Sequence, residues 1–324
     1  MTVTAAAGSV LEASSPAAVR LTGVSKSFGK GGAPVLDGID LEVAPGEFLC
    51  LLGASGCGKS TLLNLIAGLD PASSGSIELP GDGSRPGHAA LMFQESALFP
   101  WLTAGRNIEL ALKLRGLRDR AARRAEAQRL LGLVRLETSY DKRVHELSGG
   151  MRQRVALARS LAQQAQVLLM DEPFAALDAI TRDVLHEELV KLWQETRLTV
   201  IFVTHNVREA ARLGQRVVLL SSRPGRIARQ WRVEIPQPRR IEDAAVTELT
   251  REITAELLAA RIRDTKAAYA PDFSTAVAKV AKMAQPGDLI ITLGAGSVSQ
   301  LAPMLLSELE NTPEPSINGA ELLR

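Results

Sequence analysis

The chain has 324 residues, of which 46% are hydrophobic and 23% charged, and both values are typical of a globular protein. Its net charge of +2 gives no indication that nucleic acid is a partner. The two cysteines, Cys50 and Cys57, lack metal-ligand spacing, which favours a reducing compartment and argues against a disulfide framework. No apolar run approaches the ~20 residues that a membrane-spanning helix needs, so a membrane role would require a partner protein.

The first half of the chain predicts short strands around a glycine-rich loop. Residues 1–18 are rich in alanine and serine and are expected to form a disordered tail rather than a signal peptide. Residues 19–21 and 39–43 alternate in polarity, as exposed strands do. Residues 48–52 are continuously apolar, which predicts a strand that is buried on both faces. A helix is expected at 60–69, after the loop.

The rest of the first 240 residues predicts helices that separate two further buried strands. The pattern is helical over residues 103–138, and the fully apolar strands are expected at 167–170 and 199–203. Buried strands alternating with helices are typical of an α/β fold with a mostly parallel sheet.

The pattern changes after residue 240. Residues 241–265 are predicted to form a helical linker, because apolar residues recur at helical spacing. Residues 266–310 predict a helix–strand–helix fragment whose strand covers 289–292. The last residues, 311–324, are predicted to be a loose tail.

The glycine-rich loop fits the pattern G-x-x-x-x-G-K-S/T between a buried strand and a helix. Its glycines allow successive backbone N–H groups to point at phosphate oxygens, and the helix N-terminus adds partial positive charge. Lys59 can reach the β- and γ-phosphates, and the Ser60 hydroxyl can ligate Mg²⁺. The alternative is a glycine-rich turn with a chance lysine, and the strand–loop–helix context argues against it. The residues expected to bind nucleotide here are Gly53, Ala54, Ser55, Gly56, Cys57, Gly58, Lys59, Ser60 and Thr61.

Cys57 lies within this loop and has two interpretations. One is redox control of nucleotide binding. The other, which we favour, is a small side chain at a position where only the backbone is used.

Two strands end in side chains that suit phosphate chemistry. Asp171 and Glu172 follow the strand at 167–170, and ligands of α/β sheets gather at such strand ends. Asp171 is expected to hold Mg²⁺, and Glu172 to orient and deprotonate the attacking water. His205 follows the strand at 199–203 and could contact both the γ-phosphate and Glu172. The alternatives are a turn with solvated acids and a structural histidine.

The segment from Leu147 to Arg154, Leu-Ser-Gly-Gly-Met-Arg-Gln-Arg, resembles the signature motif of ABC ATPases. The other motifs of that family occur in order over residues 19–240. Gln94 resembles the Q-loop glutamine, Asp178 the D-loop acid, His205 the switch histidine and Phe28 the aromatic residue that stacks on adenine.

The resemblance implies a P-loop NTPase fold of the ABC ATPase type. That fold has a mostly parallel core sheet, an antiparallel β subdomain and a helical subdomain, to which this chain adds the small C-terminal helix–strand–helix appendage. It also implies an enzyme that hydrolyses ATP with Mg²⁺. The implied catalytic residues are Glu172, His205, Gln94 and Lys59, and the implied metal ligands are Ser60, Gln94 and Asp171.

The resemblance further implies a homodimer joined through its nucleotide sites. Ser148, Gly149 and Gly150 of one copy would close over the γ-phosphate held by the other copy, with Asp178 beside them. Ala175 stands where the D-loop commonly has serine, a departure that recurs in one importer branch.

Three segments resemble that branch, which contains nitrate, sulfonate and taurine importers: residues 99–103, 172–182 and 221–227. The branch implies transmembrane permease subunits, an indirect role for an extracytoplasmic solute-binding protein, no nucleic acid, and a peripheral location at the cytoplasmic face of the cell membrane. We expect the apolar stretch at 99–101 to dock a membrane subunit, with Trp101 near the contact; local burial is the alternative. The ATPase subunit does not touch solute, so the solute is left open.

Residues 269–309 resemble the C-terminal end of UDP-N-acetylmuramate–L-alanine ligase, mainly at 286–296 and 301–303. The ligase's ATP loop and central domain have no counterpart here, so a fusion remnant or docking appendage is favoured over a second activity. A soluble ABC ATPase of DNA repair or translation is another alternative. Gln94 and Ser148 are only 54 positions apart (148 − 94), too few for the long coiled-coil arm of that class.

Overall fold

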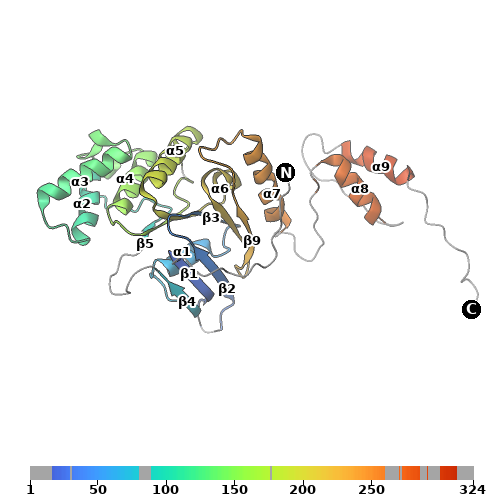
Figure 1. Cartoon of the computed structure of the whole chain (residues 1–324), viewed down its shortest axis with the longest axis horizontal. Coiled ribbons are helices and arrows are strands. Elements are labelled where there is room, and N and C mark those ends of the chain that lie inside the picture. Colours follow the sequence, from blue (N-terminus) through green and yellow to red (C-terminus); the bar gives the residue numbers. More distant parts are fainter. Residues whose placement is uncertain are drawn as a thin grey trace, which may run out of the picture. The chain divides into compact units, whose positions relative to one another are not determined.

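The structure is a computed structural model that describes residues 17–29, 31–79, 89–175, 177–259, 270, 272–284, 290 and 300–311. The chain divides into two compact units, Met1–Arg261 and Ile262–Arg324 (Figure 1). The predicted tails up to residue 16 and from residue 312, Ala176 of the D-loop, and the predicted strand at 289–292 apart from Ile290 lie outside the described residues. Ala18 had been assigned to the N-terminal tail. It is instead buried, and its N–H donates to the Val43 carbonyl at 2.7 Å.

A three-stranded antiparallel sheet forms the β subdomain. Its strands are β1 (Val19–Ser27), β2 (Pro34–Val43) and β4 (Ser74–Glu78), in the order β2-β1-β4. The strands predicted at 19–21 and 39–43 are therefore confirmed, and each is longer than its alternating stretch.

A six-stranded sheet forms the centre of the first unit, in the order β5-β6-β7-β3-β8-β9. All neighbouring strands are parallel except β8 and β9, which confirms the mostly parallel sheet. The strands are β3 (Phe48–Gly53), β5 (Ala89–Met92), β6 (Val167–Asp171), β7 (Thr199–Val203), β8 (Arg216–Leu220) and β9 (Ile227–Arg232).

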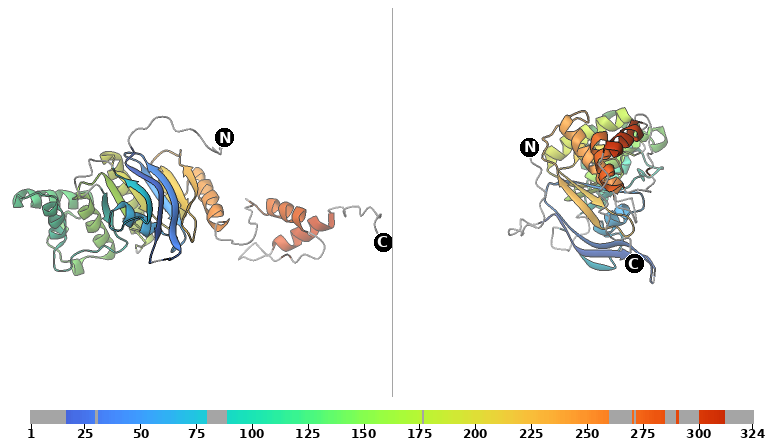
Figure 2. Two further views of the ribbon diagram at one scale, coloured as in Figure 1. Left: turned by 90° about the horizontal axis from the view of Figure 1, so that it is seen from below. Right: turned by 90° about the vertical axis from the view of Figure 1, so that its right-hand side faces the viewer.

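The continuous apolar pattern of β3 arises because its alternate side chains enter two separate cores. Leu49 and Leu51 pack with the small sheet and with helix α1 (Lys59–Ile66). Phe48, Cys50 and Leu52 pack on the opposite face, with the helices that cover it. Figure 2 shows the three-stranded sheet, in blue, beside the strands of the larger sheet. Neither face of β3 meets water, and both must therefore be apolar.

The helical subdomain consists of α2 (Ala104–Leu114), α3 (Arg120–Leu133) and α4 (Gly149–Leu161), which pack against one another. The helical pattern predicted over 103–138 is confirmed and contains the two α-helices α2 and α3. Gly116 lies between them, with a φ of +108° that glycine adopts more readily than other residues. Thr103 caps the N-terminus of α2.

One helix follows β6, a second follows β7, and a third follows β9. These are α5 (Ala179–Thr196), α6 (Val207–Leu213) and α7 (Ala244–Ala259). The helix α7 lies in the segment predicted as a linker, but it packs against α6 with Val246 and Ile253 fully buried. Most of that segment is therefore a structural part of the first unit.

The described residues of the second unit include the helices α8 (Phe273–Met283) and α9 (Leu301–Asn311), which contact each other and bury Val277 and Leu305. Both flanking helices of the predicted helix–strand–helix are present. Over the residues that the structure describes, helices long and apolar enough to cross a membrane are absent.

Candidate nucleotide site

The site lies at the carboxyl edge of four neighbouring parallel strands, β5, β6, β7 and β3. Because the strands are parallel and paired in register, the residues that follow them meet at one edge. Gln94 follows β5, Asp171 and Glu172 end β6, His205 follows β7, and the glycine-rich loop follows β3. The tertiary structure therefore gathers the predicted catalytic residues along one line.

The backbone of the loop has the curvature that a phosphate cradle needs. Gly56 and Gly58 have φ values of +76° and +103°, in the left-handed region. The φ of Gly58 favours glycine, and a β-carbon there would also lie 2.6 Å from Leu36 Cδ2, so that this side chain would have to shift. Helix α1 begins at Lys59, directly after Gly58, and its first-turn N–H groups face the loop.

Cys57 acts as a packing residue of the loop. Its side chain is buried, and a β-carbon on Gly53 would lie 2.5 Å from its Sγ. Burial raises the pKa of the thiol, which keeps it protonated and unreactive. These features support the interpretation of a small, tolerated side chain over redox control.

The Lys59 amine lies between the loop and the acids that end β6. It is 6% exposed and donates hydrogen bonds to the carbonyls of Gly53 at 2.9 Å and Ala54 at 3.1 Å. The same amine is 4.0 Å from Glu172 Oε1. A positive charge is thus held at the base of the loop, close to the carboxylate of Glu172.

Ser60 and Asp171 form a pair of hard oxygen donors. Burial raises the pKa of Asp171, and the negative charge of Glu172 raises it further, whereas a hydrogen bond with Ser60 and the charge of Lys59 lower it. A half-buried carboxylate beside a hydroxyl and a second acid is a donor set that suits Mg²⁺. The side chain of Gln94, the third predicted ligand, is exposed, and its backbone carbonyl accepts a hydrogen bond from Gln153 Nε2 at 2.9 Å.

Glu172 and His205 are in direct contact. Glu172 Oε2 lies 2.9 Å from His205 Nδ1, while the Glu172 side chain is 18% exposed and that of His205 is 59% exposed. Glu172 has a φ of +44°, and its N–H donates to the Val203 carbonyl at 3.0 Å. A non-glycine residue in this region costs of order 1–3 kcal/mol, which the surrounding contacts must offset.

The signature segment and the D-loop lie side by side at two helix N-termini. Ser148 caps α4, where its hydroxyl accepts from Met151 N at 3.2 Å, and Gly149 is open to solvent. Asp178 caps α5 and accepts from Thr181 N at 2.9 Å, which lowers the pKa of its carboxyl. A β-carbon on Gly150 would lie 2.9 Å from Thr181 Cγ2, so the two segments are packed closely.

Phe28 follows β1 and is 55% exposed. The Lys26 amine lies 5.0 Å from the centroid of its ring. An exposed aromatic face near a cation is compatible with stacking on a base.

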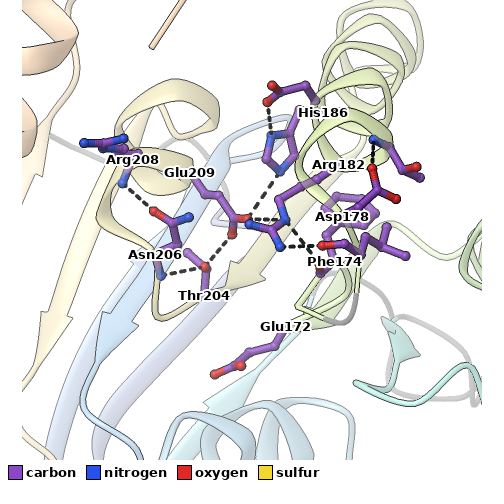
Figure 3. A network of polar contacts seen from close by, with 12 residues as sticks. Glu172, Phe174, Asp178, Arg182, His186, Thr204, Asn206, Arg208 and Glu209 are labelled. Carbon is purple, nitrogen blue, oxygen red and sulfur yellow. Dashed lines mark hydrogen bonds and ion pairs between the residues drawn. The ribbon is translucent and has the colours of Figure 1, made fainter. Parts of the chain in front are cut away.

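Three further residues near Glu172 contact one another: Arg182, Thr204 and Glu209 (Figure 3). The sequence by itself assigns them no role. Together with Glu172, His205 and neighbouring residues they line a small polar cavity of about 30 Å³. Glu209 lies on α6, where the mixture of charged and apolar residues is typical of a helix at the protein surface. Only its burial at 7% exposure distinguishes it, and the sequence carries no signal of that.

Comparison with known proteins agrees with this geometry. Residues 36–175 match the family model described as ABC transporter. The chain is 46% identical over 226 residues to a nitrate import ATP-binding protein of Synechocystis, an alignment that covers 67% of this chain and 83% of the relative. It is 48% identical over 201 residues to a taurine import ATP-binding protein of Mesorhizobium japonicum, covering 61% and 78%.

A solved dimeric ATP-binding cassette in a post-hydrolysis state, bound to ADP and Pi, superposes with a TM-score of 0.60 at 33% identity. It covers 67% of this chain and 100% of the cassette. These relatives give no support to the ligase resemblance of residues 269–309. The fold, the clustered motifs and the relatives agree, and the chain therefore belongs to the ABC transporter family as an ATP-binding, ATP-hydrolysing subunit.

Proposed function

We propose that this chain energises the import of a small anionic solute, such as nitrate, an aliphatic sulfonate or taurine, by hydrolysing ATP as a homodimer. The observation that carries the proposal is the Glu172–His205 contact beside Lys59 at the end of the phosphate loop. The solute class is supported by the importer-like segments of the sequence and by relatives named for nitrate and taurine import.

In this proposal each residue of the sheet edge has a separate task. Lys59 and the loop N–H groups bind the β- and γ-phosphates, and Phe28 stacks on adenine. Glu172 orients the attacking water and accepts its proton, and His205 holds the Glu172 carboxylate while facing the γ-phosphate. Ser60, Asp171 and Gln94 would hold Mg²⁺, which when bound neutralises charge on the phosphates.

The second half of each nucleotide site comes from a second copy of the chain. The signature residues Ser148, Gly149 and Gly150 and the D-loop Asp178 lie at exposed helix N-termini, which favour an anion. In the homodimer these residues close over the nucleotide held by the other copy. The dimeric state of the solved cassette supports this arrangement.

The partner at the membrane is a permease, docked on the segment that follows Gln94. Trp101 is 66% exposed and Phe99 37%, and their ring centroids are 5.3 Å apart. The exposure of Trp101 argues against local burial, and a pair of exposed aromatic rings suits a protein contact. The chain would then be peripheral at the cytoplasmic face of the cell membrane, with a solute-binding protein acting through the permease and with no nucleic-acid partner.

The test is reconstitution with the permease and solute-binding protein encoded nearest to this chain's gene. We expect ATP hydrolysis to rise, and the anion to enter vesicles, only when all components are present. Trp101→Ala should keep the ATPase rate of the isolated subunit and lose most of the stimulation by the permease. Leu69→Ala is the matched control, because Leu69 is similarly apolar and 62% exposed but follows α1.

Full stimulation of Trp101→Ala would remove Trp101 from the contact. An ATPase that responds to no permease would favour the alternative of a soluble, non-transport ABC ATPase.

A further inference from the structure

An ion pair between Arg182 on α5 and Glu209 on α6 lies beside the two loops that supply Glu172 and His205, with the Arg182 side chain 26% exposed. Glu209, on α6, is 7% exposed, and its Oε2 accepts a hydrogen bond from the Thr204 hydroxyl at 2.6 Å. Its Oε1 lies 3.5 Å from Arg182 Nε, on the first turns of α5 (Figure 3). Thr204 directly precedes His205, so Glu209 contacts the neighbour in sequence of the residue that carries the imidazole.

Arg182 connects the same carboxylate to the loop that follows Glu172. Its guanidinium donates to the carbonyl of Phe174 at 3.3 Å and to that of Leu177 at 2.6 Å. Both carbonyls lie within the segment that leads from Glu172 to Asp178. Arg182 thus holds the backbone next to a residue whose own φ of +44° requires external support.

Thr204 is fixed in turn by the backbone around it. It is 2% exposed, its N–H donates to the Leu51 carbonyl at 3.2 Å, and its hydroxyl accepts from Asn206 N at 2.9 Å. Glu209 therefore links two segments of the chain. Through Arg182 it reaches the backbone of the segment after Glu172, and through Thr204 it reaches the residue before His205, whose Nδ1 lies 2.9 Å from Glu172 Oε2.

His186 lies against the same carboxylate but does not share its charge. Its Nε2 is 3.6 Å from Glu209 Oε1, and burial lowers the pKa of the imidazole to about 3, helped by the charges of Arg212 and Arg182. The ring is neutral at physiological pH, so Arg182 supplies the positive charge at Glu209. A buried carboxylate costs free energy unless it is paired with a positive charge. The pairing of Glu209 with Arg182 offsets this cost.

We propose that Glu209, held by Arg182 and Thr204, is a positioning residue that sets the geometry of the Glu172–His205 pair. This inference rests on the proposed roles of Glu172 and His205. Glu209 does not touch the reacting atoms. It connects the loop after β6 to the loop after β7. This connection keeps the Glu172 carboxylate and the His205 imidazole 2.9 Å apart.

The test uses the full-length double variant Arg182→Met/Glu209→Leu, in which both charges are replaced by apolar groups. Replacing both partners leaves no unpaired charge at the site, while the carbonyls of Phe174 and Leu177 lose the Arg182 donor. With MgATP as substrate we expect kcat to fall about 10- to 100-fold, because a shift of about 1 Å at the site has an effect of that size. The KM for ATP should stay close to wild type, since the phosphate loop is untouched. The thermal midpoint should fall by only a few degrees, because the variant loses hydrogen bonds but leaves no unpaired charge, and the assay is run well below that midpoint.

Asp183→Asn is the matched control. Asp183 forms an ion pair with Arg212 at 2.6 Å and so joins the same two helices, α5 and α6, one residue further along. It should leave kcat within about twofold. A double variant with wild-type kcat, or a control that loses as much as the double variant, would overturn the proposal.

A second readout does not depend on catalysis. The His205 imidazole resonance, identified with a His205→Gln variant, should move in the double variant and stay in place in Asp183→Asn. If the wild-type chain hydrolyses no ATP, the proposed function fails, while this resonance still decides whether Glu209 positions His205. An unmoved resonance contradicts the positioning role.

Discussion

Both α1 and α4 have glycine at or next to their N-terminus, but the two helices differ in the residue that caps them. Gly58, which has no side chain, caps α1, and the Lys59 amine is held inside the adjacent loop. At α4 the Ser148 hydroxyl already accepts a backbone hydrogen bond, and the segment faces solvent. The phosphate loop at α1 is thus enclosed by its own chain, whereas the N-terminus of α4 is exposed, as the proposed dimer requires.

The largest effect is expected where the two halves of the site would meet. Glu172→Gln should lower turnover at least about 100-fold, because the amide cannot accept the proton of the attacking water. ATP binding at α1 should persist, and the variant should accumulate as an ATP-bound dimer in size-exclusion chromatography. Hydrolysis at the wild-type rate would exclude Glu172 as the base.

The next effect tests the half-site that one chain completes alone. Lys59→Ala should weaken ATP binding about 10- to 100-fold, since a charge-assisted contact with the phosphates contributes about 1.5–3 kcal/mol. Titration calorimetry on the purified chain measures it. Unchanged affinity would argue against the phosphate-loop assignment.

A smaller effect is expected at the other helix. Ser148→Ala removes the cap of α4, at a cost of about 1 kcal/mol in stability, and should lower turnover about tenfold while ATP affinity changes far less than in Lys59→Ala. Calorimetry and a steady-state assay on the same preparation separate the two quantities. Equal losses of affinity in Ser148→Ala and Lys59→Ala would break the distinction between the two helix N-termini.

The smallest effect is expected from the second unit. Removal of residues 266–324 should leave ATP binding and hydrolysis unchanged, because both helix N-termini and the catalytic strand ends lie in the first unit. Rates of the full-length and truncated chains are compared directly, with ligation of L-alanine to the nucleotide-sugar substrate as a second assay. A truncated chain that folds without hydrolysing ATP, or any ligation product, would show that the second unit has a role in catalysis.

Helix α7 shows what a local sequence pattern predicts and what it does not predict. Its apolar spacing predicted a helix correctly, since spacing along one face is a property of the sequence alone. The surface that receives this face belongs to α6, and the pattern carries no information about the partner. For this reason the segment was predicted as a linker although it packs onto the first unit.

The sequence by itself determined the nucleotide-binding loop, the two-sided burial of β3 and the order of the motifs. Each of these depends on neighbouring residues and on backbone conformation. The tertiary structure alone decided the burial of Glu209, its pairing with Arg182 and the exposure of Trp101. The physical reason is that the free energy of a charged or aromatic side chain depends on which other segments surround it. Those segments come together only when the strands take their places in the sheet.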